Sequence, residues 1–90
     1  MDKGDAYIFL PGGVGTYEEF FEVLSSRVMK KHNKPIGLLN HEGFFDPLIH
    51  MIKHGVKEKF ISTSVMDMII IGTTPNELLK SVLRKHEELL

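Results

Sequence analysis

The chain has 90 residues, with eleven basic and twelve acidic side chains and a formal charge of −1 at pH 7 when histidine is neutral. This length predicts a single small domain, and the balanced charge excludes the basic surface that binds nucleic acid or an anionic membrane. The sequence has no cysteine, which excludes disulfides and thiolate metal sites. No apolar run approaches the ~20 residues that cross a bilayer, and "MDKGD" has no hydrophobic signal region. We therefore expect a cytoplasmic protein.

The first predicted strand covers residues 6–10, "AYIFL", an apolar run typical of a strand that is covered on both faces in a parallel sheet. A glycine-rich loop, "PGGVG", follows at residues 11–15. Apolar residues then recur at helical spacing from Tyr17 to about Lys31, and the basic end of this segment suits the helix dipole. Pro35 prevents the predicted helix from continuing.

A second buried strand is predicted at Ile36–Leu39. Asp46 and Pro47 are expected to be the N-cap and the first residue of a second helix. A third strand is expected at residues 68–71, "MIII", and a last helix is expected to open with a capping box in "TPNE", residues 74–77.

This alternation of strands and helices predicts the fold class. Right-handed crossovers turn it into an α/β fold, a Rossmann-like parallel sheet with alternating helices, here three strands and three helices. Doubly wound nucleotide folds usually have five or more strands and bind ligands at the carboxyl ends of those strands. We therefore expect residues 1–90 to form one partial domain whose amino-terminal half is absent.

The glycine loop predicts a phosphate site. A strand that runs through such a loop into a helix is expected to point the backbone N–H groups of Val14, Gly15, Thr16 and Tyr17 at one place, where the helix dipole favours an anion. Glycines allow close approach and positive φ angles, and the Thr16 hydroxyl is a further donor. The loop is neither a Walker loop, which needs Gly-Lys-Thr or Gly-Lys-Ser, nor G-x-G-x-x-G, because Glu18 replaces the third glycine.

A purely structural interpretation of this segment also stays open. Thr16 and Glu19 have the spacing of a capping box, in which Glu19 bonds back to the Thr16 N–H. Glu18 and Glu22 are typical of a solvated helix face. The functional alternative for Glu19 is a carboxylate held near the phosphate, where it contacts sugar hydroxyls or acts as an acid or base.

The stretch "PGGVGTYEE", Pro11–Glu19, matches the signature P-G-G-x-G-T-x-x-E. Through it, and through "KPIGLLN", "GFFDPLI" and "FIS", the chain resembles the carboxy-terminal half of the LONELY GUY (LOG) family, cytokinin riboside 5′-monophosphate phosphoribohydrolases often labelled "lysine decarboxylase-like". The resemblance implies hydrolysis of the N-glycosidic bond of a nucleoside monophosphate, such as a cytokinin riboside monophosphate or AMP, to free base and ribose 5-phosphate. It also implies no metal or organic cofactor and a homodimer or higher homo-oligomer.

The resemblance assigns roles to the signature residues. Gly12, Gly13, Val14, Gly15 and Thr16 are implied to bind the substrate phosphate, with Tyr17 at the end of this segment. Glu19 is implied to be the catalytic carboxylate and Glu18 to lie near the ribose. Cleavage of the C–N bond builds positive charge on the sugar, which a carboxylate stabilises.

Family members carry an Arg-Lys pair before the strand that precedes the glycine loop, and this sequence has no such pair there. Arg27 lies roughly 12 Å along the helix from Glu19, at 1.5 Å per residue, which is too far to replace it. We therefore expect little or no hydrolysis by these 90 residues alone. The alternative function is a catalytically silent nucleotide-binding or dimerisation module.

Two other patterns are weaker. His50 and His54 have i, i+4 spacing, but the metalloprotease pattern needs Glu at position 51, where Met51 stands, so we interpret them as surface residues. Phe44 and Phe45 either line a pocket for a base or, as we expect, belong to the core.

Overall fold

Strand β2 (Ile36–Leu39) is the centre of a parallel three-stranded sheet in the computed structural model, which describes residues 6–89. It pairs with β1 (Tyr7–Phe9) on one side and with β3 (Ile69–Gly72) on the other, which gives the order β1-β2-β3. Ile36 and Leu38 are completely buried, as a central strand of a covered sheet requires. The Rossmann-like α/β class and the bounds of the second strand are thus confirmed.

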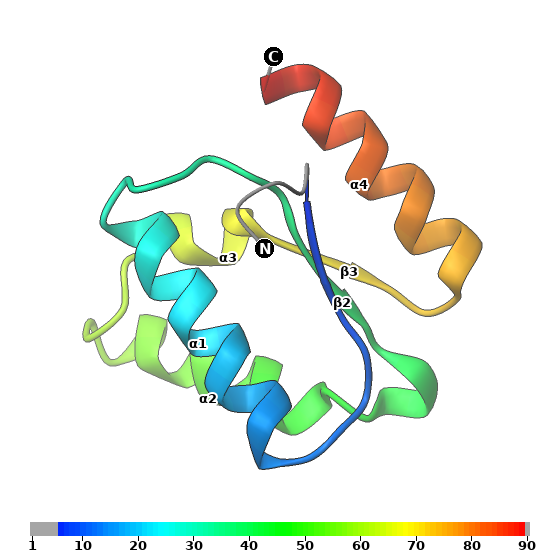
Figure 1. The fold of residues 1–90 in the computed structure, drawn as a ribbon. Coiled ribbons are helices and arrows are strands. Elements are labelled where there is room, and N and C mark those ends of the chain that lie inside the picture. Colours follow the sequence, from blue (N-terminus) through cyan, green and yellow to red (C-terminus); the bar gives the residue numbers. More distant parts are fainter. Residues whose placement is uncertain (1–5, 90) are drawn as a thin grey trace.

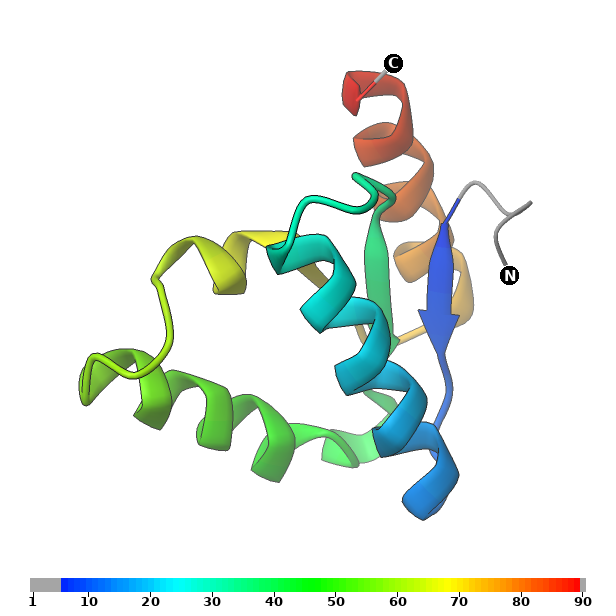
Figure 2. The same cartoon turned by 60° about the vertical axis from the view of Figure 1, so that its left-hand side comes forward.

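Helices cover both faces of this sheet (Figures 1 and 2). Three helices lie on one face, namely α1 (Val14–Val28), α2 (Asp46–Lys57) and α3 (Ser64–Met68), and α4 (Pro75–Leu89) lies on the other. The short helix α3 and the 3-10 turn η1 (His41–Gly43) were not predicted from the sequence. Because α3 includes Met68, strand β3 begins one residue later than expected.

Strand β1 is shorter than residues 6–10 and is covered on one face only. Tyr7 and Phe9 are buried, whereas Ile8 between them is 43% exposed. The expectation of burial on both faces is therefore wrong for this strand. The physical reason is that α4 packs over β2 and β3, which leaves the outer face of β1 bare.

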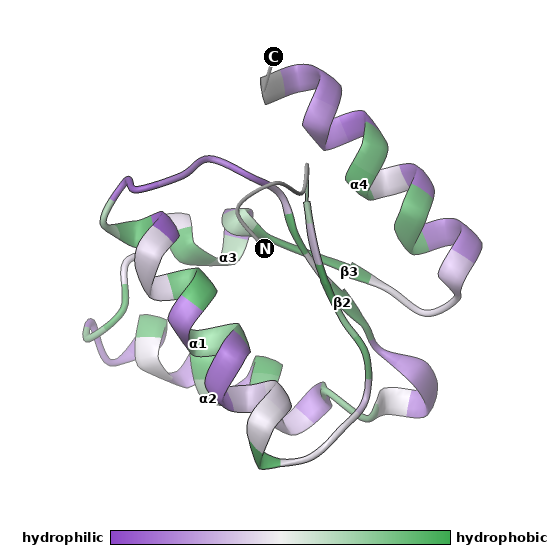
Figure 3. Ribbon diagram, in the orientation of Figure 1, coloured by the Kyte–Doolittle hydropathy of each residue, from purple (hydrophilic) through white to green (hydrophobic). Residues whose placement is uncertain are grey.

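The main core lies between the sheet and α1, α2 and α3, and it consists of apolar side chains. Figure 3 shows hydrophobic residues along the strands and, alternating with hydrophilic ones, on the helices. The rings of Phe9 and Phe20 meet edge to face with centroids 5.6 Å apart, and Phe20 is completely buried. This contact fixes the first turns of α1 against β1 and so positions the loop that joins them.

On the opposite face, α4 packs directly on two glycines of the sheet. A Cβ atom at Gly72 would lie 2.7 Å from Leu78 Cα, and one at Gly37 would lie 3.0 Å from the side chain of Val82. The helix approaches the strands this closely because neither glycine has a side chain. At the start of α4, the Glu77 N–H donates to the Thr74 hydroxyl at 3.2 Å, so this half of the predicted capping box is confirmed.

The start of α2 differs from the prediction by one residue. Phe45 is the N-cap and Asp46 is the first helical residue, so the expectation that Asp46 caps this helix is wrong. The Asp46 carboxylate instead accepts a hydrogen bond from Asn40 Nδ2 at 2.8 Å. Its oxygen is therefore used to hold the loop that leaves β2.

Candidate functional site

The glycine loop passes directly into helix α1, which begins at Val14, three residues earlier than predicted. Gly13 is the N-cap, and its carbonyl accepts the N–H groups of Thr16 at 3.1 Å and Tyr17 at 3.4 Å. Within residues 6–89, the N–H groups of Val14 and Gly15 have no backbone acceptor. Two of the four N–H groups predicted to bind an anion are therefore already bonded, because those of Thr16 and Tyr17 donate to the Gly13 carbonyl.

The three glycines of the loop have different structural roles. A Cβ atom at Gly12 would collide with the Thr16 hydroxyl, so any other residue there would force the Thr16 side chain to move. At Gly13 and Gly15 a Cβ atom would meet no atom within 4 Å. None of the three has a positive φ angle, so that part of the prediction is wrong. The packing of the fold therefore leaves room for a side chain at positions 13 and 15.

Glu19 is exposed and does not cap the helix. Thr16 is the third residue inside α1, and the helix has no side-chain cap, so the capping box of Thr16 and Glu19 is wrong. Among the described residues, the carboxylate of Glu19 makes no hydrogen bond or ion pair. It follows Gly15 by one helical turn, and helical side chains lean toward the N-terminus of their helix, so its carboxylate leans toward the first turn.

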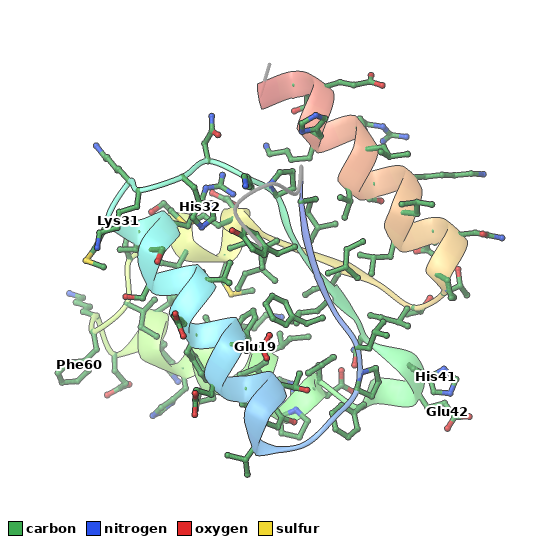
Figure 4. The ribbon with its side chains drawn as sticks, viewed as in Figure 1. Glu19, Lys31, His32, His41, Glu42 and Phe60 are labelled. Carbon is green, nitrogen blue, oxygen red and sulfur yellow. The ribbon has the colours of Figure 1, made fainter. Side chains whose placement is uncertain are left out.

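A cleft of about 700 Å³ runs beside this carboxylate, between α1 and the side of the sheet that ends in β1. Glu19, Glu22 and Ser26 line it from one face of α1, and Figure 4 shows Glu19 on the side of the helix that looks toward β1. The remaining lining residues come from β1, from α1 and from the segment that follows α1, namely Tyr7, Val23, Lys31, His32 and Lys34. Glu18 lies on a neighbouring face of the helix and does not line the cleft.

The end of the cleft farthest from the glycine loop is held by His32 (Figure 4). Its Nδ1 accepts the Lys34 N–H at 3.1 Å, so its Nε2 carries the proton that is donated to the Val23 carbonyl at 3.1 Å. Arg27 donates from Nη1 to the Lys34 carbonyl at 2.7 Å, and burial lowers the pKa of its guanidinium. Arg27 therefore holds the segment that follows α1 in place, through Lys34, and does not line the cleft with Glu19.

The loop after β2 lies at the same end of the sheet as the glycine loop (Figures 1 and 2). Asn40 is 8% exposed, and its Oδ1 accepts the Phe45 N–H at 2.7 Å. Phe45 is completely buried, which confirms the core interpretation for this ring, whereas Phe44 is partly exposed beside it. Helical or strand periodicity does not predict these hydrogen bonds, because Asn40 lies in the turn that follows β2.

His50 and His54 are both exposed on α2. Within residues 6–89, no three histidine, aspartate or glutamate side chains are grouped so that they would hold a metal ion. None of the helices in this described part is long and apolar enough to cross a membrane.

A family model described as "possible lysine decarboxylase" matches residues 1–82. A probable cytokinin riboside 5′-monophosphate phosphoribohydrolase of Oryza sativa subsp. japonica is 44% identical over 80 residues, which cover 89% of this chain and 32% of that protein. Two cytokinin riboside 5′-monophosphate phosphoribohydrolases of Arabidopsis thaliana are 45% and 40% identical over 87% and 96% of this chain. The chain spans between 32% and 42% of the length of these relatives.

Proposed function

This chain belongs to the family described as possible lysine decarboxylases, and on that premise we propose that it carries the phosphate-binding loop and the catalytic carboxylate of a nucleotide phosphoribohydrolase. The proposed substrate is a cytokinin riboside 5′-monophosphate or a related purine nucleoside monophosphate such as AMP. The proposed products are the free base and ribose 5-phosphate. The names of the matched relatives support this substrate class.

The observation that carries the proposal is the pair of glycines that the fold does not require. Gly13 and Gly15 leave open space at the start of α1, directly beside the N–H groups of Val14 and Gly15. Two unpaired N–H groups at a helix N-terminus favour an anion, and a phosphate group satisfies both. In this proposal the Thr16 hydroxyl donates to the same phosphate.

The position of Glu19 determines the direction of the bound nucleotide. With the phosphate on the first turn of α1, the ribose extends along the face that carries Gly15 and Glu19 and into the cleft. In the proposed reaction the bond between C1′ and the base nitrogen breaks, and its electron pair leaves with the base. Water adds to C1′, and its proton is transferred to the base. The Glu19 carboxylate stabilises the positive charge on the sugar and orients the water.

We keep the homodimer or higher homo-oligomer as part of this proposal. Its support is that several large apolar side chains of the described residues are exposed, among them Ile8 at 43% and Phe60 at 89%. Association with a second copy would remove such side chains from water.

The proposal is tested by joining the amino-terminal part of the matched Arabidopsis enzyme to residues 1–90 of this chain and changing Glu19→Gln in the chimera. Glutamine keeps the size of the side chain and leaves the phosphate loop untouched, so AMP binding is expected to persist. Release of free base from AMP and from a cytokinin riboside monophosphate is expected to fall by about 10²-fold or more.

The matched control is Glu87→Gln, which changes an exposed carboxylate on α4 outside the cleft, and the helix content of each variant is checked by circular dichroism. Unchanged base release by the Glu19→Gln chimera would show that Glu19 is not the working carboxylate.

A further inference from the structure

The side chain of Asn40, directly after β2, is a buried amide with both of its polar atoms hydrogen-bonded. Its Oδ1 accepts the Phe45 N–H at 2.7 Å, and its Nδ2 donates to the Asp46 carboxylate at 2.8 Å. Only this orientation of the amide satisfies both partners, because an N–H needs an acceptor and a carboxylate needs a donor. The Asn40 N–H also donates to the Gly72 carbonyl at 2.8 Å. One residue therefore ties the ends of β2 and β3 to the start of α2.

The turn that these bonds close has an unusual backbone. Glu42 and Gly43 follow one another in the left-handed region, at φ 51° and 75°. A Cβ atom at Gly43 would lie 2.8 Å from Asp46 Oδ2, so glycine lets this carboxylate approach the turn. A residue such as Glu42 keeps a left-handed conformation only where its surroundings impose it. The side chains of His41 and Glu42 are exposed and project outward (Figure 4), so the inner bonds of Asn40 hold the turn.

This turn contacts the first turn of α1 through Phe45. The Phe45 ring is completely buried and meets the Tyr17 ring edge to face, with centroids 6.1 Å apart. Tyr17 is the fourth residue of α1, and the start of α1 lies at the same end of the sheet as the loop after β2 (Figures 1 and 2). A continuous set of contacts therefore runs from Asn40, through two aromatic rings, to the turn that carries the proposed phosphate site.

The first turn of α1 depends on this contact because its own hydrogen bonds are long. The helix has no side-chain cap, and the N–H groups of Thr16 and Tyr17 reach the Gly13 carbonyl at 3.1 and 3.4 Å. Ordinary bonds of this kind measure about 2.9–3.0 Å. The glycines in and before this turn also give its backbone more freedom to lose on folding than other residues would. Packing of the Tyr17 ring is therefore an important restraint on this turn.

We propose that Asn40 is a positioning residue for the phosphate site, which sets the place of the first turn of α1 through Phe45 and Tyr17 without touching the substrate. The proposal rests on the proposed function and adds to it a residue outside the glycine signature. A phosphate is bound only when the N–H groups of Val14 and Gly15 point at one place. A turn that is fixed before the ligand arrives binds more tightly, because less ordering has to occur on binding.

Reversal of the pair formed by Asn40 and Asp46 tests the proposal. Asn40→Asp keeps an acceptor for the Phe45 N–H but sets two carboxylates against each other, which displaces the turn. Binding of inorganic phosphate and of AMP to the 90-residue chain at pH 7 is expected to weaken by about tenfold or more. Addition of Asp46→Asn places one donor between the two side chains again, and the double variant is expected to bind both ligands within about threefold of the unchanged chain.

Amide hydrogen exchange measures the order of the first turn without any ligand. In Asn40→Asp, exchange of the Thr16 and Tyr17 N–H groups is expected to become about tenfold faster or more, and the double variant is expected to reverse this. Val82→Ala is the matched control, because it removes a buried group from the opposite face of the sheet. It is expected to lower the melting temperature while it leaves phosphate affinity and the exchange at Thr16 unchanged.

The route through Phe45 is tested by a double-mutant cycle. Phe45→Leu removes the ring contact with Tyr17 and is expected to weaken phosphate binding by itself. In that background Asn40→Asp is expected to cause no more than about a twofold further loss, because two changes on one route are not additive. Losses that add in full would overturn the proposed route.

Three other outcomes would overturn the proposal. They are equal phosphate affinity and equal Thr16 exchange in Asn40→Asp, a double variant that stays defective, and a loss of affinity that Val82→Ala reproduces. The last of these would show a general effect of stability. If the unchanged chain binds neither phosphate nor AMP, the proposed function is refuted, and the exchange of the Thr16 and Tyr17 N–H groups decides the positioning role by itself.

Discussion

Replacement of Gly15 by alanine is expected to make the protein more stable while it weakens phosphate binding. Gly15 is the second residue of α1, and an added Cβ atom meets no atom within 4 Å, so no packing cost opposes the change. Alanine is favoured over glycine in helices by about 0.5–1 kcal/mol, and a position in the first turn gains about the lower value. For a domain of this size, about 0.5 kcal/mol raises the melting temperature by about 2–4 °C.

The same methyl group occupies the proposed phosphate site. The Cβ atom of a helical residue leans toward the helix N-terminus, which is the space beside the N–H groups of Val14 and Gly15. A phosphate that is pushed out of contact with these donors is expected to bind at least tenfold more weakly, about 1.4 kcal/mol. Titration calorimetry with inorganic phosphate and with AMP measures this loss, and thermal melting measures the gain in stability.

Two matched variants complete the experiment. Ser25→Ala adds helix propensity at an exposed position of the same helix and is expected to raise stability with no effect on binding. Gly12→Ala is expected to destabilise the protein, because its Cβ atom collides with the Thr16 hydroxyl. If Gly15→Ala binds phosphate as tightly as the unchanged chain, or lowers the melting temperature, the assignment of this glycine to ligand approach is refuted.

The packing of α4 and the ends of two helices give further predictions. Gly72→Ala is expected to destabilise the chain by about 1–3 kcal/mol in urea denaturation, because its Cβ atom overlaps the backbone of Leu78; equal stability would mean that α4 is not packed on this glycine. Lys30 and Lys59 end α1 and α2 in the left-handed conformation, at φ 62° and 67°. Glycine adopts this conformation without strain, so Lys30→Gly and Lys59→Gly are each expected to stabilise the chain by about 1 kcal/mol. Unchanged urea midpoints would show that the two lysines are not strained.

The local pattern of apolar residues was enough to predict the central strand of the sheet. The run at Ile36–Leu39 is a central strand, so apolar continuity gives its bounds without error. The same rule fails for β1, because a strand at the edge of the sheet is covered only where a helix reaches it, and helix placement is not a local property. Helix α3, at Ser64–Met68, spans five residues and is too short to show a hydrophobic period.

The candidate site was predictable only in part. The glycine signature indicates a phosphate site from local chemistry alone, and Gly15, Glu19, Glu22 and Ser26 have the spacing of one helix face, so the stripe along the cleft was present in the sequence. The wall of the cleft that lies opposite α1 was not predictable from the sequence. Tyr7 reaches the cleft only because β1 pairs with β2 in one register, which no local pattern specifies.

In the proposed function, the exposure of Glu19 determines how much catalysis its carboxylate can provide. A carboxylate 4 Å from a positive charge contributes about 1 kcal/mol in water and about 4 kcal/mol at an effective dielectric constant of 20. The difference corresponds to roughly a hundredfold in rate. Glu19 is exposed, and the cleft beside it lies along β1, whose outer edge is unpaired within residues 6–89.

We expect the amino-terminal part of the chimera to cover this cleft, so the chimera is expected to release base at least a hundredfold faster than the 90-residue chain alone. Glu19→Gln is expected to remove most of that difference, since the covered carboxylate is its source. Base release is measured for the chain and the chimera, each with and without Glu19→Gln, at the same saturating AMP concentration. If Glu19→Gln lowers the rate by the same factor in both, burial of Glu19 is not what makes it effective, and the carboxylate acts through a contact that the 90 residues already contain.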